Sequence, residues 1–355
     1  MGPTKQTEQF ALTQVISDVE HYLNSYLHKQ LDGAKRLNSD YANLWEVIID
    51  VNAAGGKRIR PYMTMLSYRA FGGVEYKAVL PIASAIELLH CAMLVHDDII
   101  DRDYVRRGKP NVAGQYFQKY QGNEDRSHLA ASAALIAGDL LISAAYQCVL
   151  ESDLNAEQKL FAHKIIGEAI FEVCGGELMD TEAVIYQPDE VNSLKIAELK
   201  TAGYSFDAPL RMGAKLAGAS EGAINNLSNY ARSVGVAFQL TDDLLGVFGD
   251  ESVTGKPEGS DLKEAKRTYL LQRTLKNLHG EDKNEFEKLV GRDIDRQELE
   301  RARDLMKQSG AVDEADSIIE AQISLATKAL EKLNFDSDDR NEFEKLIKKS
   351  IKRAF

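Results

Sequence analysis

Residues 86–110 constrain the fold of this chain more than any other stretch, because an apolar run leads directly into a cluster of charged side chains. Apolar residues recur at helical spacing in the first half of the stretch and predict a helix with one apolar wall. Asp97 and Asp101 lie four residues apart, so a helix stacks their carboxylates on one face, with Asp98 beside them. Like charges at this spacing repel each other. Mg²⁺, which proteins hold with one or two carboxylates together with substrate phosphates, would remove that repulsion.

Arginines follow this acidic cluster within a few residues. Arg106 and Arg107 suit phosphate oxygens, because a guanidinium group binds them in a bidentate manner. A DDxxD pattern taken alone is better explained by a solvated acidic helix end that precedes a basic turn. Here the acids follow an apolar helix, which favours a site at the rim of an apolar wall.

The composition predicts one helical domain. The chain has 355 residues, 44% of them hydrophobic and 28% charged, so it can bury a large core as one large domain or two smaller ones. Only seven prolines and long stretches of 3.6-residue periodicity predict an all-α fold. No linker rich in Pro, Gly or Ser interrupts them, so a single domain over residues 1–355 is the simplest organisation. The net charge of −12 argues against a nucleic-acid-binding surface.

The cysteines and the hydropathy indicate the compartment. Cys91, Cys148 and Cys174 have no metal-ligand spacing and cannot all pair, which fits a reducing cytosol. The first ten residues lack the pattern of a signal sequence. We expect no apolar run long enough to span a membrane, and therefore a soluble, cytoplasmic protein without a membrane anchor.

Further clusters accompany the first one. Residues 55–61, GGKRIRP, place two glycines before three cations, so that backbone can approach an anion, although a charged turn without a role fits equally well. Residues 221–246 repeat the first theme, since an apolar helix reaches Asp242 and Asp243. The Ala-rich residues 129–150 predict a central buried helix or a subunit contact.

In their order and spacing, the segments GGKRIRP, LLHCAMLVHDDIID, RRGKP, KTAGYSF, FQLTDDLLG and GKPEGSDLKEAK resemble the trans-isoprenyl (polyprenyl) diphosphate synthases, most of all the bacterial geranylgeranyl diphosphate synthases. The resemblance covers about residues 50–270, and residues 268–355 are expected to add charged amphipathic helices. It implies an all-α bundle of the isoprenoid synthase type around a deep apolar cavity, a homodimer, and dependence on Mg²⁺. The implied reaction condenses isopentenyl diphosphate with dimethylallyl, geranyl or farnesyl diphosphate.

The resemblance also implies a role for each matching residue. Two Mg²⁺ ions on the allylic diphosphate would be held by Asp97, Asp98 and Asp101, and a third by Asp242 and Asp243. The allylic diphosphate itself would be contacted by Arg106, Lys200, Lys256 and Lys266. Isopentenyl diphosphate would be bound by Lys57, Arg60, His90 and Arg107, although a lone helical histidine is more often structural. The allylic cation would lie beside Thr201 and Gln239.

One position departs from the pattern of these synthases. The second acidic motif usually reads DDxxD, and here Gly246 replaces its last aspartate. Because Asp242 is expected to be the direct metal ligand, we expect activity to survive.

The length of the product is expected to depend on the helix that precedes Asp97. Ala92 lies five residues before it, about 7.5 Å along a helix axis. In the synthases that the chain resembles, a bulky aromatic residue at this position stops growth at C15, whereas Ala92 leaves the cavity open and Met93 obstructs it only in part. This predicts a C20 product, geranylgeranyl diphosphate, with longer products as the alternative.

Two other classes of protein share part of this pattern. A class I terpene cyclase has helices and DDxxD but lacks a second diphosphate substrate, for which GGKRIRP and RRGKP would be needed. A non-catalytic subunit of a hetero-oligomeric synthase tends to lose the aspartates, which are present here.

Overall fold

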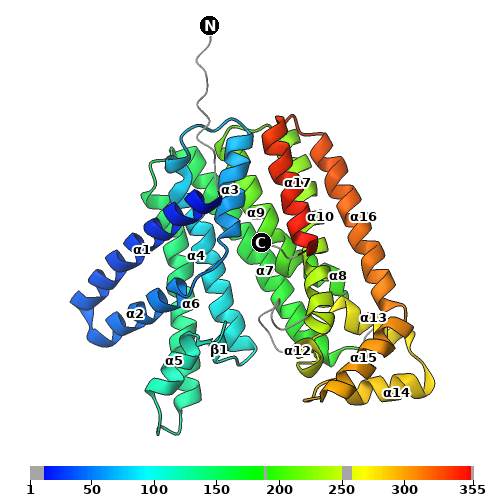
Figure 1. The fold of residues 1–355 in the computed structure, drawn as a ribbon. Coiled ribbons are helices and arrows are strands. Elements are labelled where there is room, and N and C mark those ends of the chain that lie inside the picture. The colour runs from blue at the N-terminus through cyan, green and yellow to red at the C-terminus, as the bar shows by residue number, and fades with distance from the viewer. Residues whose placement is uncertain (1–11, 188–189, 250–257, 353–355) are drawn as a thin grey trace. The chain divides into compact units, whose positions relative to one another are not determined.

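The chain folds almost entirely into helices in the computed structural model, which describes residues 12–187, 190–249 and 258–352 (Figure 1). Within these residues the strands are limited to a two-residue pair, β1 (Val105–Arg106) and β2 (Lys109–Pro110), which run antiparallel with Val105 opposite Pro110. The prediction of an all-α fold is therefore confirmed.

Contacts group the helices into two compact units, each of which has its own core. The prediction of a single domain over residues 1–355 remains a prediction. Unit 1 comprises residues 1–166 and 209–219, and unit 2 comprises residues 167–208 and 220–355. One helix, α7 (Ala156–Glu182), contributes residues to both.

Two long apolar helices form the centre of unit 1, namely α4 (Tyr76–Ile100) and α6 (Arg126–Glu151). Gly138 of α6 lets them approach, because a Cβ there would lie 2.0 Å from the Nε2 atom of His96. By length and hydropathy both could cross a membrane, so the expectation that no apolar run is that long is wrong. In the structure they are core helices, with 61% and 44% of their most apolar windows buried. The lower share for α6 reflects a face that the chain leaves exposed.

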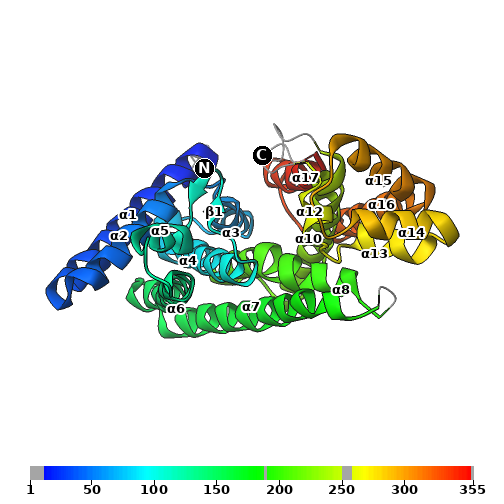
Figure 2. The same cartoon turned by 90° about the horizontal axis from the view of Figure 1, so that it is seen from below.

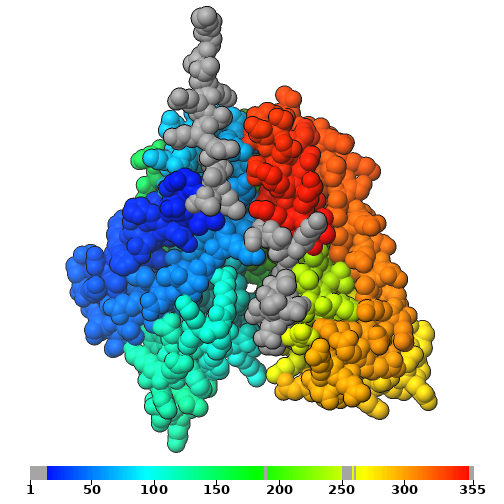
Figure 3. Space-filling view, viewed as in Figure 1, coloured from blue at the N-terminus to red at the C-terminus, as the bar shows by residue number. Residues whose placement is uncertain are grey.

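The other helices of unit 1 pack around this pair. They are α1 (Leu12–Leu37), α2 (Ser39–Ala53), α3 (Ile59–Ala70), α5 (Val112–Lys119) and most of α9 (Ala208–Leu216). Helices α1 and α2 lie on the surface of the unit (blue in Figure 3). The last segment, α9, packs on α3, where the Ser67 hydroxyl donates to the Leu210 carbonyl at 2.7 Å.

Unit 2 is built around α10 (Glu221–Phe248), which contacts helices on several sides (Figure 2). Besides the end of α7, the other elements of unit 2 are η1 (Ala183–Ile185), α8 (Ser193–Ala197), η2 (Glu198–Asp207), α12 (Ser260–Lys263), α13 (Tyr269–Asn277), α14 (Gly280–Leu289), α15 (Arg296–Gln308), α16 (Ala311–Glu331) and α17 (Ser337–Lys352). Tyr230 fixes α17 on α10, since its hydroxyl donates to the Phe343 carbonyl at 2.7 Å inside the core.

The η2 segment is a π-helix, in contrast to the α-helices that surround it. The N–H of Ala208 donates to the carbonyl of Gly203, five residues earlier. Two glycines on neighbouring helices make room for the wider turn. A Cβ on Gly176 of α7 would lie 2.5 Å from the Lys200 nitrogen, and one on Gly235 of α10 would lie 2.5 Å from the Cα of Ala202.

Candidate active site

The first acidic cluster lies at the C-terminal end of α4, as the sequence predicts. Asp97 is half-buried, Asp98 is buried and Asp101 is exposed. Asp101 caps the helix, and its N–H donates to the Asp97 carbonyl at 2.8 Å. The three carboxylates therefore extend from the protein interior to solvent.

Arg106 of β1 binds two of these carboxylates. Its Nε donates to Asp98 at 2.8 Å and its Nη2 donates to Asp97 at 3.0 Å. Burial raises the pKa of Asp98 to about 6, and the bond from Arg106 opposes that rise. The structure thus brings together Asp97, Asp98 and Arg106, and it ties the predicted phosphate ligand to the predicted metal ligands.

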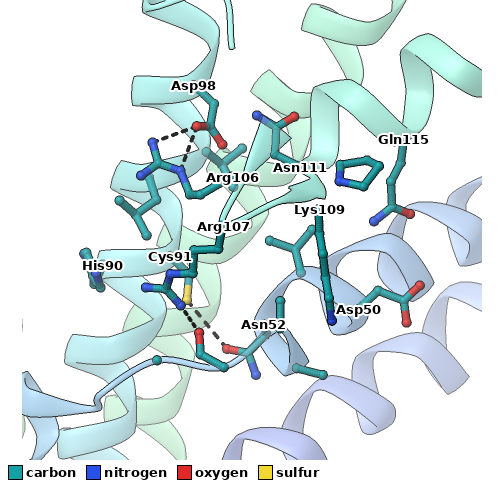
Figure 4. Close-up of a pocket in the computed structure, with 18 of the residues that line it drawn as sticks. Asp50, Asn52, His90, Cys91, Asp98, Arg106, Arg107, Lys109, Asn111 and Gln115 are labelled. Atoms are coloured by element: carbon teal, nitrogen blue, oxygen red, sulfur yellow. Dashed lines mark hydrogen bonds and ion pairs between the residues drawn. The ribbon is translucent and has the colours of Figure 1, made fainter. Parts of the chain in front are cut away.

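A tight turn between β1 and β2 directs the arginines. Arg107 and Gly108 have φ angles of 54° and 73°, which form a turn with two left-handed residues. Arg107 then reaches the loop before α3, where its Nη1 donates to the Gly55 carbonyl (Figure 4). The RRGKP segment and the GGKRIRP segment are therefore joined by a hydrogen bond.

Within GGKRIRP, Arg58 has a structural role. It is 5% exposed, pairs with the buried Glu87 at 2.8 Å, and donates to the Asn52 carbonyl at 2.9 Å. These contacts fix the loop against α4, so that Lys57 is exposed and Arg60 is half-buried.

Two cavities of unit 1 meet at these residues. One of about 460 Å³ is lined by residues 54–60 with Glu87, His90 and Arg107, and so collects all four residues predicted to bind isopentenyl diphosphate. Another of about 580 Å³ lies under the β hairpin and shares Arg107 and His90 with the first (Figure 4). Burial, then the positive charges of Arg60 and Arg107, hold the pKa of His90 well below its usual value. His90 is therefore a neutral imidazole, which can donate one hydrogen bond.

In unit 2, the predicted residues of η2 and α10 form two sets of contacts. Lys200 is held by Glu177 at 2.9 Å and by Asp180 at 2.7 Å, both from α7. The Thr201 hydroxyl donates to Gln239 at 2.6 Å, and the Gln239 amide donates to Asp243 at 2.9 Å. Sequence reasoning missed Glu177 and Asp180, although their i, i+3 spacing after two glycines was a signal that could have found them.

Asp243 is the more buried aspartate of the second motif, at 7% exposed. Burial raises its pKa to about 7, and the charge of Asp261 adds to the rise, while the bond from Gln239 opposes it. Asp242 is half-buried beside it. Lys266 is also half-buried and pairs with Glu264 at 3.1 Å. Lys256 lies outside the described residues.

Gly246, where the motif departs from the usual pattern, has a steric explanation. A Cβ at this position would lie 2.2 Å from a carboxylate oxygen of Asp261. Asp261 therefore fills the space that a longer side chain would need. No pattern in the sequence connects these two positions.

The donors of both clusters suit Mg²⁺. They are oxygen atoms of carboxylates, the ligand type that this ion prefers. Among the described residues, no group of three or more His, Cys, Asp or Glu side chains is placed to hold a metal by itself.

Comparison with known proteins identifies the chain. The model of the family described as polyprenyl synthetase matches residues 42–306. This chain belongs to the polyprenyl synthetase family. A polyprenyl synthetase is a prenyltransferase, here a trans-prenyl diphosphate synthase, and the family depends on Mg²⁺.

Relatives of this polyprenyl synthetase differ in the product that they are named for. The chain is 36% identical to geranylfarnesyl diphosphate synthase from Aeropyrum pernix, over 74% of this chain and 79% of that one. It is 31% identical to geranylgeranyl diphosphate synthase from Sulfolobus acidocaldarius, over 91% and 94%. The fold matches a geranylgeranyl pyrophosphate synthase from Corynebacterium glutamicum, solved with isoprenyl diphosphate and magnesium, with a TM-score of 0.90 and 29% identity over 97% and 99%. These likenesses establish the isoprenoid synthase fold and leave the product length open.

Proposed function

We propose that this enzyme condenses isopentenyl diphosphate with an allylic diphosphate and releases all-trans geranylgeranyl diphosphate, C20. The observation that carries the proposal is the cavity that collects Lys57, Arg60, His90 and Arg107, joined by the hairpin to the pair of Arg106 with Asp97 and Asp98. A terpene cyclase has no second diphosphate to place in such a cavity. A non-catalytic subunit has no need for the carboxylates.

The cavity residues would bind and orient isopentenyl diphosphate. Lys57, Arg60 and Arg107 supply positive charge for its phosphates. His90 would donate a hydrogen bond to these phosphates and, as a neutral imidazole, would add no charge. These contacts would hold the double bond of the acceptor against the allylic carbon that ionises.

The remaining residues would act on the allylic substrate. Three Mg²⁺ ions would be held by Asp97, Asp98 and Asp101 in unit 1 and by Asp242 and Asp243 in unit 2. Bound there, Mg²⁺ would neutralise charge that develops on the leaving diphosphate. Carboxylates hold Arg106 and Lys200 in this structure, and both cations would exchange these partners for phosphate oxygens when the allylic diphosphate binds. Lys256 and Lys266 would complete this set.

Thr201 and Gln239 would stabilise the allylic cation. Their side-chain oxygens carry partial negative charge, and the bond between them fixes both dipoles in advance. The acceptor double bond then forms the new carbon–carbon bond, and the proton lost from the product goes to the released diphosphate. The apolar wall of α4 would exclude water, which otherwise quenches the cation.

Product length would be set by Ala92 and Met93 on α4. Ala92 has no exposed surface and Met93 is half-buried, so of these two residues only Met93 keeps accessible surface. A flexible methionine in place of an aromatic ring supports growth past C15.

A homodimer in the cytoplasm completes the proposal. Helix α6 exposes Leu135 and Ile136, each about half accessible, on the face that unit 1 leaves uncovered. Two neighbouring exposed apolar side chains of this kind support an interaction site on α6. The three cysteines are all unpaired thiols, which fits a reducing compartment.

The test is an elongation assay on the purified protein. It receives labelled isopentenyl diphosphate with dimethylallyl, geranyl or farnesyl diphosphate, and product lengths are determined after dephosphorylation. A C20 product that EDTA abolishes is expected. Longer products would support the condensation reaction but refute the proposed C20 length. Release of a cyclic hydrocarbon, or no elongation with any primer, would refute the proposed reaction.

A further inference from the structure

One arginine of α10 joins the two ends of the π-helix η2. Arg232 donates from Nη1 to Glu198, the first residue of η2, at 3.2 Å, and from Nε to Asp207, the last residue, at 3.1 Å. Its Nη2 also donates to both oxygens of Glu172 on α7, at 2.8 and 3.1 Å. All five donor hydrogens of a guanidinium lie in one plane, so one rigid group fixes three carboxylates, two from η2 and one from α7.

The π-helix needs such support from outside. Segments of this kind are rare and cost more backbone energy than an α-helix, so they persist where the surroundings fix them. Close packing contributes at Gly203, where a Cβ would lie 2.1 Å from the Glu172 carboxylate that Arg232 holds. Arg232 and Gly203 therefore place the same carboxylate against η2.

Burial and charge make the arginine hard to replace. The Asp207 side chain is 2% exposed, and Arg232 is 28% exposed. One guanidinium faces three carboxylates, of which that of Glu198 also forms an ion pair with Lys195 at 2.9 Å. Without Arg232 the carboxylates would repel each other, and a buried Asp207 would lose this cation.

We propose that Arg232 is a positioning residue: it holds the ends of η2 together and thereby sets Lys200 and Thr201, which lie between them, for the allylic half of the reaction. Arg232 acts through the backbone of η2. The roles of Lys200 and Thr201 rest on the proposed function, whereas the clamp on η2 is a property of the fold.

The test compares four variants of the full-length protein with the wild type. Arg232→Gln removes the guanidinium, and Arg232→Lys keeps the positive charge without the planar guanidinium. Glu198→Gln loosens one end of η2 while the ion pairs of Arg232 with Asp207 and Glu172 stay. Arg301→Gln is the matched control, because Arg301 pairs with Glu285 at 2.6 Å and Asp282 at 3.4 Å away from η2.

Hydrogen exchange and steady-state kinetics are measured on each form. In Arg232→Gln, amides of residues 198–207 are expected to exchange at least about 10-fold faster than in the wild type, with α13 unchanged. We expect kcat to fall about 10- to 100-fold, since small displacements of positioning residues cost that much. KM for isopentenyl diphosphate should stay within about 2-fold, because its predicted cations belong to unit 1. For Arg232→Lys and Glu198→Gln, the exchange rates of residues 198–207 and kcat should lie between those of the wild type and those of Arg232→Gln. Arg301→Gln should match the wild type.

Three outcomes would overturn the inference. They are unchanged protection of residues 198–207 in Arg232→Gln, equal loss of protection throughout unit 2, and loosened η2 with unchanged kcat. If Arg232→Gln does not fold, Arg232→Lys and Glu198→Gln decide by the same exchange pattern. If the wild type elongates no substrate, the proposed function fails, and the exchange data alone still decide whether the clamp exists.

Discussion

At the scale of single residues, two cations assigned to the allylic diphosphate are held by carboxylates in this structure. Arg106 rests on Asp97 and Asp98, and Lys200 on acids of α7. Partly buried charges are costly unless they are paired, so these contacts keep each charge compensated before substrate arrives. Binding of metal and phosphate would exchange one set of partners for another.

The length of the product can be changed at two adjacent residues of α4. Met93→Ala removes the side chain that retains accessible surface, so we expect products longer than those of the wild type. Ala92→Phe adds a ring where no free surface exists, so we expect shorter products. Chain lengths are measured by chromatography after dephosphorylation.

A folding control accompanies this pair, because a ring at the fully buried Ala92 overpacks the core. We expect an unfolding free energy lower by about 1–3 kcal/mol, which denaturant titration measures. Unchanged chain lengths in both variants, with folded protein, would refute the role of α4 in length control.

The buried Asp243 predicts a stability that depends on pH in the metal-free protein. Its pKa is about 7 when folded, against a usual value of 3.8, so the folded state keeps a proton that the unfolded state releases between about pH 4 and 7. The unfolding free energy therefore falls as pH rises through that window. Asp243→Asn removes this contribution and is expected to be more stable than the wild type at pH 8, by up to roughly 4 kcal/mol, and equal near pH 4.

Urea titrations in a chelating buffer at several pH values measure the difference. If the two proteins keep a constant difference from pH 4 to pH 8, Asp243 does not carry a raised pKa.

From the sequence, contacts can be predicted between residues that lie close together along the chain. Asp97 and Asp101 could be placed together because a helix fixes an i, i+4 pair. Asp261 could not be connected with Gly246, because their contact depends on how α12 folds back on α10. Contacts at long sequence separation leave no periodicity in the sequence.

At the scale of elements, two adjacent glycines of α7 differ in how closely they pack against η2. Gly176 meets the backbone of Lys200, which cannot move aside, whereas nothing lies within 4 Å of a Cβ on Gly175. We expect Gly176→Ala to lower the unfolding free energy by about 1–3 kcal/mol and to reduce elongation. Gly175→Ala should be neutral or stabilising by about 0.5–1 kcal/mol, since alanine favours a helix.

Thermal unfolding and the elongation assay compare the two variants. Equal behaviour of both would show that η2 does not need the close approach of α7. The π-helix itself could not be predicted, because KTAGYSFD has the pattern of an ordinary helix and the wider turn depends on Gly176, Gly235 and Arg232 from neighbouring helices.

At the scale of the whole molecule, the exposed face of α6 predicts the oligomeric state. A double change, Leu135→Glu with Ile136→Glu, places charges on the apolar patch and is expected to give a monomer. The control is Leu37→Glu, which changes an even more exposed leucine, 77% accessible, at the end of α1. Light scattering with size exclusion measures the mass. A wild type that is monomeric, or a double variant that remains dimeric, contradicts the proposal.

The helical fold was predictable because 3.6-residue periodicity is a local property of most segments. The division of the chain into two units could not be predicted, because residues 209–219 return to unit 1 after a segment of unit 2. Only tertiary contacts such as Ser67 with Leu210, and Gly213 with the Thr64 carbonyl, reveal that return.

This discontinuity has a consequence for synthesis on the ribosome. Residues 167–208 must be translated before α9 can reach α3, a delay of roughly 2–8 seconds at bacterial or eukaryotic rates. During that interval α4 and α6, both long and apolar enough for a bilayer, belong to a unit that lacks its last helix. A nascent chain paused before residue 209 would therefore present chaperones and targeting factors with the face of α3 that α9 covers in the finished enzyme.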